Sequence, residues 1–290
     1  MIFSAENDFL KITVDSRGAE LVSFFSNRLQ KEFLWNGDPR FWQRRSPLLF
    51  PIVGRLKDDK YKIGDLFFTL KQHGFARDSV FSVEEISAQR LSFWLQENEE
   101  TLKIYPFKYS LKIVYEIKGN ELMIEAKIKN RGNEKMPFSL GFHPAFVCPF
   151  EKEEKIDEYF LIFEKEEKCE RLYLEEGLIT KKEIFWLKDR ILPLSENLFA
   201  NDAIILNKPL SKKVVLQRKD FRSAKIEVDF EEFNYLGLWK KKEARFVCIE
   251  PWNGLPDYKE SEQDFFKKDG VIILKKNQTI SFKLKIRLLE

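Results

Sequence analysis

Alternation of apolar and polar residues is the feature that most constrains the fold of this chain. In TISFKLKIRL, residues 279–288, bulky apolar side chains take every second position. The stretches LMIEAKIKN (122–130) and AKIEVDF (224–230) repeat the pattern. Because successive side chains of a strand point to opposite faces of a sheet, this period of two predicts half-buried antiparallel strands. Similar runs lie near residues 8–14, 18–26, 90–96, 108–118, 159–164 and 213–218.

Helical patterns are scarce by comparison. The stretch SEQDFFKKDG predicts one short helix, with Ser261 as its N-cap and Gly270 as its stop. Strand and helix patterns do not alternate, which argues against a parallel nucleotide-binding sheet. We therefore predict one all-β domain over residues 1–290, a large antiparallel β-sandwich whose two sheets pack face to face.

Composition excludes several functional classes. The chain carries 50 Lys and Arg against 47 Asp and Glu, a balance that lacks the segregated basic field of nucleic-acid-binding proteins. Its three cysteines form no C-x-x-C pair, and two histidines are too few for a typical His/Cys metal cage. No stretch has the length of a membrane span, and the charged N-terminal segment does not resemble a signal peptide. We expect a cytoplasmic protein with no cofactor, no metal, no nucleic-acid partner and no membrane contact.

Two stretches suggest proton-transfer chemistry. In CIEPWNGLPD, residues 248–257, Glu250 shares a face with Cys248 at a predicted strand end before a proline. In PFSLGFHPAF, residues 137–146, His143 follows a strand pattern beside small residues. A glutamate and a histidine can perform general acid/base catalysis without a cofactor. Taken singly, each has an ordinary structural alternative, a surface carboxylate and a hydrogen-bonded core imidazole.

Two further stretches carry candidate binding groups. The segment 41–61 is interrupted by prolines and a glycine, which predicts an irregular crossing flanked by Arg44, Arg45 and Arg55. An arginine fork suits hydroxyl or anionic oxygens, although arginines also extend over apolar surface without any ligand. In QHGFARD, residues 72–78, His73 precedes a glycine at a predicted turn, where backbone can approach a ligand or the histidine can be purely structural.

Taken together, these stretches resemble the aldose 1-epimerase (galactose mutarotase) family, and within it the LacX-like branch. The matching stretches are WNGDPRFWQRRSPLLFPIVGRLKDDKY, HGFARD, LGFHPAF, NDAIIL and CIEPWNGLPD, in an alignment that runs from about residue 8 to residue 288. The resemblance implies a large β-sandwich, or supersandwich, with an open cleft for a sugar. It also implies an isomerase that interconverts the α and β anomers of a free monosaccharide.

The resemblance assigns roles to particular residues. Glu250 is implied to be the general base at the anomeric hydroxyl, and His143 the acid that protonates the ring oxygen. The implied substrate-binding residues are Arg55, His73 and Asp202, with Arg77 and Trp252 as further candidates. No cofactor or metal is implied. The sequence does not decide the oligomeric state between a monomer and a weak homodimer.

Departures from the family pattern leave two alternatives open. Family members with galactose activity usually carry tyrosine and asparagine after the His-Pro pair, where this chain has Ala145 and Phe146. One alternative is a hexose-6-phosphate 1-epimerase with a phosphate pocket built from Arg44, Arg45, Arg55, Lys57 and Arg77. The other is a non-catalytic sugar-binding or sensing module. In every case Trp35, Trp42 and Trp252 are candidates for stacking on a pyranose face.

Overall fold

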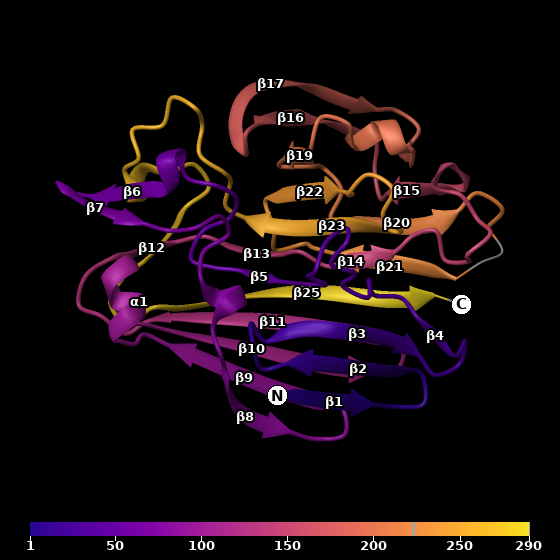
Figure 1. Cartoon of the computed structure of the whole chain (residues 1–290), viewed down its shortest axis with the longest axis horizontal. Helices are drawn as coiled ribbons and strands as arrows, with labels where there is room; N and C mark the ends of the chain where they lie inside the picture. Colours follow the sequence, from indigo (N-terminus) through magenta and orange to yellow (C-terminus); the bar gives the residue numbers. More distant parts are fainter. Residues whose placement is uncertain (222–223, 290) are drawn as a thin grey trace.

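The computed structural model describes residues 1–221 and 224–289, and antiparallel strands dominate it (Figure 1). A nine-stranded sheet forms the long back layer. In spatial order it contains β18 (Ile191–Pro193), β15 (Tyr159–Phe163), β20 (Lys213–Arg218), β21 (Lys225–Asp229), β25 (Thr279–Leu289), β11 (Glu121–Asn130), β10 (Tyr109–Lys118), β9 (Arg90–Gln96) and β8 (Ser82–Ile86).

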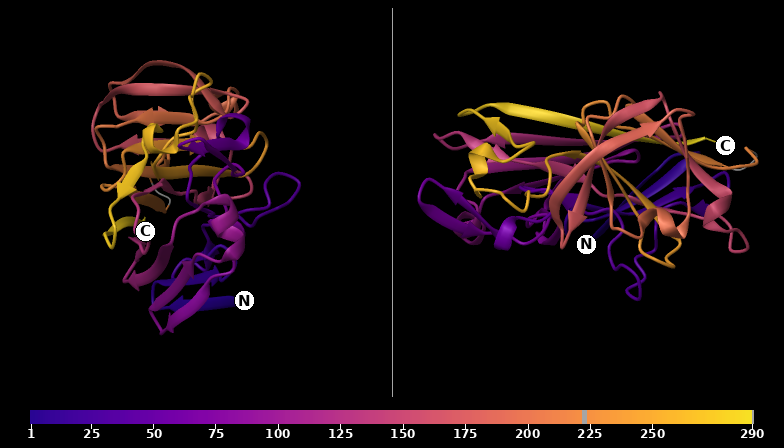
Figure 2. Two further views of the ribbon diagram at one scale, coloured as in Figure 1. Left: turned by 90° about the vertical axis from the view of Figure 1, so that its left-hand side faces the viewer. Right: turned by 90° about the horizontal axis from the view of Figure 1, so that it is seen from above.

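Two further sheets cover different parts of this layer. The eight-stranded sheet contains β17 (Leu178–Leu187), β16 (Glu167–Glu175), β19 (Ile204–Asn207), β22 (Tyr235–Trp239), β23 (Phe246–Asn253), β13 (Leu140–Phe142) and β5 (Leu48–Leu49), with β14 (Ala145–Val147) also paired to β23. The four-stranded sheet contains β1 (Ile2–Glu6), β2 (Leu10–Asp15), β3 (Glu20–Ser26) and β4 (Lys31–Glu32). Figure 2 shows this N-terminal sheet, in indigo, at the opposite end of the molecule from the pink strands β16 and β17.

Smaller elements complete the described chain. Two further two-stranded sheets are the hairpin of β6 (Lys60–Ile63) with β7 (Leu66–Thr69), and the long-range pair of β12 (Met136–Phe138) with β24 (Ile272–Leu274). The α-helix is α1 (Glu99–Ile104), and 3₁₀ turns lie at Lys57–Asp59, Ala76–Asp78, Ile156–Glu158, Glu196–Phe199 and Phe265–Lys267. Within the described residues, no helix is long and apolar enough to cross a membrane.

Pairing and burial explain why the alternating stretches form strands. Leu284 and Ile286 of β25 lie opposite Ile124 and Leu122 of β11, and all four side chains are buried. Their polar neighbours along each strand point the other way, as a period of two requires. The predicted runs correspond to β2, β3, β9, β10, β11, β15, β20, β21 and β25. The all-β prediction is therefore confirmed, but the predicted pair of sheets is wrong in number, because sheets of eight and of four strands both share a core with the nine-stranded sheet.

The core is shared between the layers. Ile12 of β2 and Phe24 of β3 belong to the same buried hydrophobic cluster as Phe93 of β9, which places the four-stranded sheet against the back layer. Leu206 of β19 and Val247 of β23 belong to that cluster too, so the eight-stranded sheet packs against the same layer. Removing apolar area from water at such layer contacts is the main stabilising contribution, roughly 25 cal/mol per Å².

The predicted helix at residues 261–270 is wrong in type and position. Only Phe265–Lys267 forms a 3₁₀ turn, and its N-cap is Asp264, whose side chain accepts from Phe266 N. Ser261 instead accepts from Gln263 N, and Gln263 has a φ of +63°, which breaks a helix at that point. The α-helix α1 begins after Asn98 with a capping box formed with Thr101.

Candidate active site

The strand that pairs with one edge of β23 is interrupted beside Glu250. Strand β13 pairs with the C-terminal end of β23 and β14 pairs with its N-terminal end, so the neighbouring strand is interrupted beside Glu250. His143 and Pro144 form that interruption, and Pro144 O accepts from Ile249 N at 3.3 Å. The local pattern of a short strand, a histidine and a proline therefore directs the imidazole to the middle of β23 rather than to a sheet edge.

The predicted strand end at Glu250 is wrong, because β23 continues through Pro251 to Asn253. The N–H of Ile249 points toward the interrupted side, and alternate residues of a strand direct their N–H groups to the same side. The nitrogen of Pro251 therefore faces the same interruption. Its missing N–H removes no ladder bond there, which is the condition under which a sheet tolerates proline.

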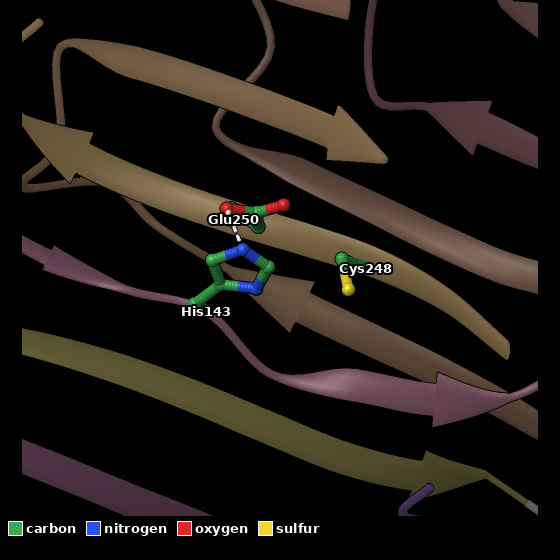
Figure 3. A group of neighbouring side chains, drawn as sticks. All are labelled: His143, Cys248 and Glu250. Carbon is green, nitrogen blue, oxygen red and sulfur yellow. Dashed lines mark ion pairs between the residues drawn. The ribbon is translucent and has the colours of Figure 1, made fainter. Parts of the chain in front are cut away.

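Glu250 and His143 meet closely inside the protein (Figure 3). Nε2 of His143 lies 3.1 Å from Oε2 of Glu250, and the two residues are 8% and 1% exposed. Burial lowers the pKa of His143 to about 3. Burial, followed by the neighbouring charge of Asp202, holds the pKa of Glu250 well above its usual range. The separation is that of an ion pair, but burial favours an uncharged imidazole beside a protonated carboxyl. The ion pair and the neutral pair contain the same number of protons, and they differ only in which group carries the shared one.

A cavity of about 300 Å³ opens beside this pair. Six of the seven side chains predicted from the sequence line it, although they are spread along the chain from residue 73 to residue 252. They are His73, Arg77, His143, Asp202, Glu250 and Trp252. Further lining residues are Phe41, Trp42, Gln72, Trp239 and Lys241. The fold therefore gathers the predicted residues around one space large enough for a small polar molecule.

Several buried polar atoms in the cavity wall lack a partner with hydrogen-bond geometry in the described residues. They are Nδ1 of His143, Oε2 of Glu250, Nε1 of Trp252 and Nε of Arg77. Buried polar atoms are normally hydrogen-bonded, because an unsatisfied one keeps its desolvation cost. Four such atoms on one wall are suited to a ligand that carries several hydroxyl groups.

Arg55 is the predicted residue that does not line this cavity. Its guanidinium donates to Asp59 and to the carbonyl of Glu176. It lines an adjoining cavity of about 490 Å³ whose wall also includes Gln72, Gly177 and Asp202. Arg55 therefore lies beyond the wall of the His143 cavity, held by partners of its own.

His73 presents one specific nitrogen to the cavity. Gly54 N donates to Nδ1 of His73 at 3.1 Å, so the ring proton is on Nε2. Burial, and then the neighbouring imidazole of His143, hold the pKa of His73 well below its usual range. His73 is thus a neutral hydrogen-bond donor. The glycine after it, Gly74, serves backbone packing rather than a ligand, because a Cβ there would lie 2.3 Å from the carbonyl oxygen of Phe50.

Asp202 lies in the loop before β19. It has a φ of +69°, and its Oδ1 accepts from Ala203 N at 2.8 Å. The residue lines the cavity of about 300 Å³ and both neighbouring cavities, beside Arg55 and beside Lys242. Asp202 therefore stands at the mouth of the site, where its charge acts on Glu250.

Sequence patterns missed Trp239, which together with Trp42 forms an aromatic wall around His143. Trp42 stacks on the imidazole with ring centroids 4.8 Å apart, rather than leaving that face open to a sugar. Trp239 contacts the same ring edge-on at 5.8 Å. Trp239 pairs with Cys248 across β22 and β23, so only the register of the sheet identifies it as a site residue.

Metal binding is an alternative to proton transfer at this position. Single ligand atoms of His143, Cys248 and Glu250 lie within 4.8 Å of one another, and all three residues are buried (Figure 3). Burial raises the pKa of the Cys248 thiol, and Cys248 is absent from the cavity wall. A protonated thiol is a poor ligand, since metals bind the thiolate. The arrangement is therefore better suited to proton transfer than to metal binding.

Comparison with known proteins identifies the family of this chain. A family model described as aldose 1-epimerase matches residues 1–287. The chain belongs to the aldose 1-epimerase family. Among relatives of this chain, the chromosomal form of protein LacX from Lactococcus lactis subsp. lactis is 34% identical over 267 residues, which cover 88% of each chain. The plasmid form of LacX matches to the same extent.

Solved structures agree with the family assignment. A galactose mutarotase related enzyme from Lactobacillus acidophilus superposes on this chain with a TM-score of 0.95 at 31% identity, covering 100% of this chain and 98% of that one. A galactose mutarotase-like protein from Lactobacillus casei gives a TM-score of 0.90 at 31% identity, covering 99% and 100%. The predicted galactose mutarotase-like β-sandwich is confirmed.

Proposed function

We propose that this protein is an aldose 1-epimerase that interconverts the α and β anomers of a free monosaccharide. The observation that supports this most directly is the buried contact between His143 and Glu250 in the wall of a cavity with unsatisfied polar atoms. Ring opening of a hemiacetal requires one base at the anomeric hydroxyl and one acid at the ring oxygen. The pair supplies both groups from neighbouring positions.

The proposed reaction moves two protons and returns them. Glu250 takes the proton from the anomeric hydroxyl while His143 gives a proton to the ring oxygen, and the bond between C1 and the ring oxygen breaks. Rotation about the C1–C2 bond presents the other face of the aldehyde. Closure then reverses both transfers, so that the pair ends with its starting proton and the anomer has changed.

Burial of the pair favours the proton-transfer step. The reactive form has Glu250 as the carboxylate and His143 as the imidazolium, which is the less favoured placement of the proton within the buried pair; after ring opening both groups are neutral. Burial raises the pKa of Glu250 and lowers that of His143, so it destabilises the first form relative to the second. The protein groups therefore transfer their protons in the favoured direction when the ring opens. General acid/base groups of this kind contribute about 10²- to 10⁴-fold each.

The remaining cavity groups are proposed to hold the sugar. His73 would donate from Nε2, and Arg77 and Trp252 carry buried N–H groups that have no acceptor among the described residues. Asp202 would accept from a hydroxyl at the mouth. Arg55 is proposed to act from the adjoining cavity, on a part of the ligand that extends beyond the wall of the His143 cavity.

The arrangement of basic residues favours a free aldose over a 6-phosphate. Of the five basic residues considered for a phosphate pocket, Arg77 lines the His143 cavity. Arg44 pairs with Asp78 at 2.6 Å, and Arg45 donates to backbone carbonyls. A phosphate is normally held by several converging donors, and within the described residues one of these five lines the His143 cavity. A purely sugar-binding module would need neither the acid nor the base.

Anomer exchange measured by NMR across free aldoses and their 6-phosphates tests this proposal. We expect the protein to accelerate exchange of at least one free aldose well above the buffer rate. Acceleration restricted to 6-phosphates would identify the sugar-phosphate alternative. Binding of a sugar without any acceleration would contradict the enzyme and support a sensing module.

A further inference from the structure

The imidazole of His143 lacks the usual hydrogen-bond anchor. A catalytic histidine is generally oriented by a hydrogen bond from its second ring nitrogen to a carboxylate or carbonyl. In His143, Nε2 faces Glu250, and the buried Nδ1 has no partner with hydrogen-bond geometry in the described part of the chain. Something else must fix the plane of this ring.

Aromatic rings surround the imidazole instead. Trp42 stacks on its face, with centroids 4.8 Å apart and planes 30° apart. Trp239 and His73 meet it edge-on, each at 5.8 Å, with interplanar angles of 84° and 83°. One stacked contact and two perpendicular contacts restrict rotation of the ring in the way that a hydrogen bond would.

Trp42 is itself held in place. Its carbonyl oxygen accepts from Nε1 of Trp35 at 2.8 Å. Its ring also contacts Trp239 at 5.5 Å and Phe246 of β23 at 5.6 Å. Because Trp42 is tied both to its own segment and to the sheet that carries Glu250, it can keep His143 in register with Glu250.

We propose that Trp42 is a positioning residue: its indole face holds the His143 imidazole with Nε2 directed at Glu250 and at the sugar ring oxygen. The same face stabilises the imidazolium that donates the proton, since cations are attracted to aromatic faces. This inference depends on the proposed role of His143 as the acid. In this proposal Trp42 orients His143 and does not stack on the pyranose ring of the sugar.

Other groups also act on the charge of this imidazole, so a test must leave them unchanged. The titratable and charged groups around it are Arg44, His73, Arg77, Asp202, Cys248 and Glu250. Trp42→Ala would admit water to the ring and alter all of these interactions. Trp42→Leu keeps an apolar bulk and removes the aromatic face, and Trp42→Phe keeps a smaller face.

The first measurement is made on the free protein. Protons of an imidazole stacked on an indole are shifted upfield by its ring current, and the chain has two histidines, so the imidazole signals can be assigned with His73→Asn. We expect the shift of His143 to disappear in Trp42→Leu and to persist in part in Trp42→Phe. Trp186→Leu, at an exposed tryptophan outside the cavity wall, should leave it unchanged.

The second measurement is anomer exchange in the same variants. Trp42→Leu should lower kcat by roughly 10- to 100-fold with little change in KM, because a misplacement of about 1 Å can cost about 100-fold. Trp42→Phe should lose less, and Trp186→Leu should behave as wild type. A wild-type kcat in Trp42→Leu, or a rise in KM alone, would overturn the proposal, the latter identifying Trp42 as a sugar platform. If the wild type showed the ring-current shift of His143 but did not accelerate anomer exchange, the proposed enzyme activity would be contradicted instead.

Discussion

Asp257 and Lys268 form a buried ion pair, with side chains 3% and 4% exposed. The second oxygen of Asp257 accepts from Lys57 N, and its backbone N donates to Arg55 O. Pro256, next to this aspartate, contacts Gly54, where a Cβ would lie 2.3 Å from the proline Cγ. Gly54 in turn donates to Nδ1 of His73. The ion pair therefore supports the segment that orients His73.

Breaking this pair should destabilise the protein strongly. Lys268→Met leaves the Asp257 carboxylate buried without its cation, and uncompensated buried charges of this kind cost about 3–5 kcal/mol. Urea unfolding followed by circular dichroism measures the change in the free energy of unfolding.

Two controls separate this effect from a loss of lysine in general. Lys259→Met removes an exposed partner of Glu175, whose pairing is worth about 0–1 kcal/mol. The double variant Asp257→Asn with Lys268→Met removes both charges and should recover part of the stability. Equal losses in Lys268→Met and Lys259→Met would show that the buried pair is not a structural support.

His73 and Arg55 should differ in their effect on sugar binding. His73 lines the cavity as a neutral donor, whereas Arg55 lies in the adjoining one. We expect His73→Ala to raise KM with a partial loss of kcat, and Arg55→Ala to have the smaller effect on KM. Steady-state anomer exchange measures both. Complete loss of the chemical step in His73→Ala with unchanged sugar affinity would mean that His73, not His143, is the acid.

Strands were predictable from the sequence where one face is buried and the other is exposed to solvent. Strands such as β11 and β25 have this character, so their period of two is visible. Strands β5, β13 and β14 are two or three residues long and almost entirely buried, so no periodicity marks them. The division of the strands into three large sheets depends on long-range pairing, which a local pattern does not carry. A single domain over residues 1–290 stays a prediction.

The candidate site was predictable in its members but not in its geometry. His143 and Glu250 were identified by residue type and by the resemblance to a family, and the structure brings them within 3.1 Å. The gap between β13 and β14 that joins them requires the register of β23. Trp42 was a candidate for stacking on a sugar, and its contact with His143 joins distant segments, which no local pattern carries. The roles of these residues remain proposals.

Activity should survive exhaustive chelation. The proposed reaction transfers protons between the sugar and two side chains and requires no Lewis acid, and the nearby Cys248 is absent from the cavity wall. Anomer exchange in EDTA, after dialysis against metal-free buffer, should match the untreated rate. Loss of activity in EDTA that one divalent ion restores would contradict a cofactor-free mechanism.

The pH profile of kcat/KM should be bell-shaped with a broad top. The active pair holds one proton, so activity falls when a second proton binds and when the last one leaves. Burial lowers the pKa of His143 to about 3, which moves the acid limb far below the ordinary histidine value of about 6.5. Burial raises the pKa of Glu250, which moves the alkaline limb above the ordinary glutamate range. Initial rates across the pH range in which the protein stays folded test this. An acid limb centred near pH 6.5 would contradict the buried, neutral pair.

Substituting the two reacting groups provides the sharpest test of the site. Glu250→Gln keeps the shape of the side chain but cannot accept the proton, so the exchange rate should fall by about 10²- to 10⁴-fold. His143→Asn should lose a comparable factor, because it removes the acid at the ring oxygen. One limb of the pH profile should disappear in each variant. Sugar binding, measured by quenching of tryptophan fluorescence, should persist in both, which separates a loss of chemistry from a loss of the cavity.

The double variant then decides whether the two groups act together. Because both protons move in one coupled step, the combined loss should fall well short of the product of the single losses. Independent groups would give losses that multiply. If Glu250→Gln kept near wild-type anomer exchange, the mutarotase mechanism at this site would fail, and a sugar-binding module would be the better account of the cavity. If the single losses multiplied fully, Glu250 and His143 would act in separate steps, and the 3.1 Å contact between them would serve orientation rather than shared proton transfer.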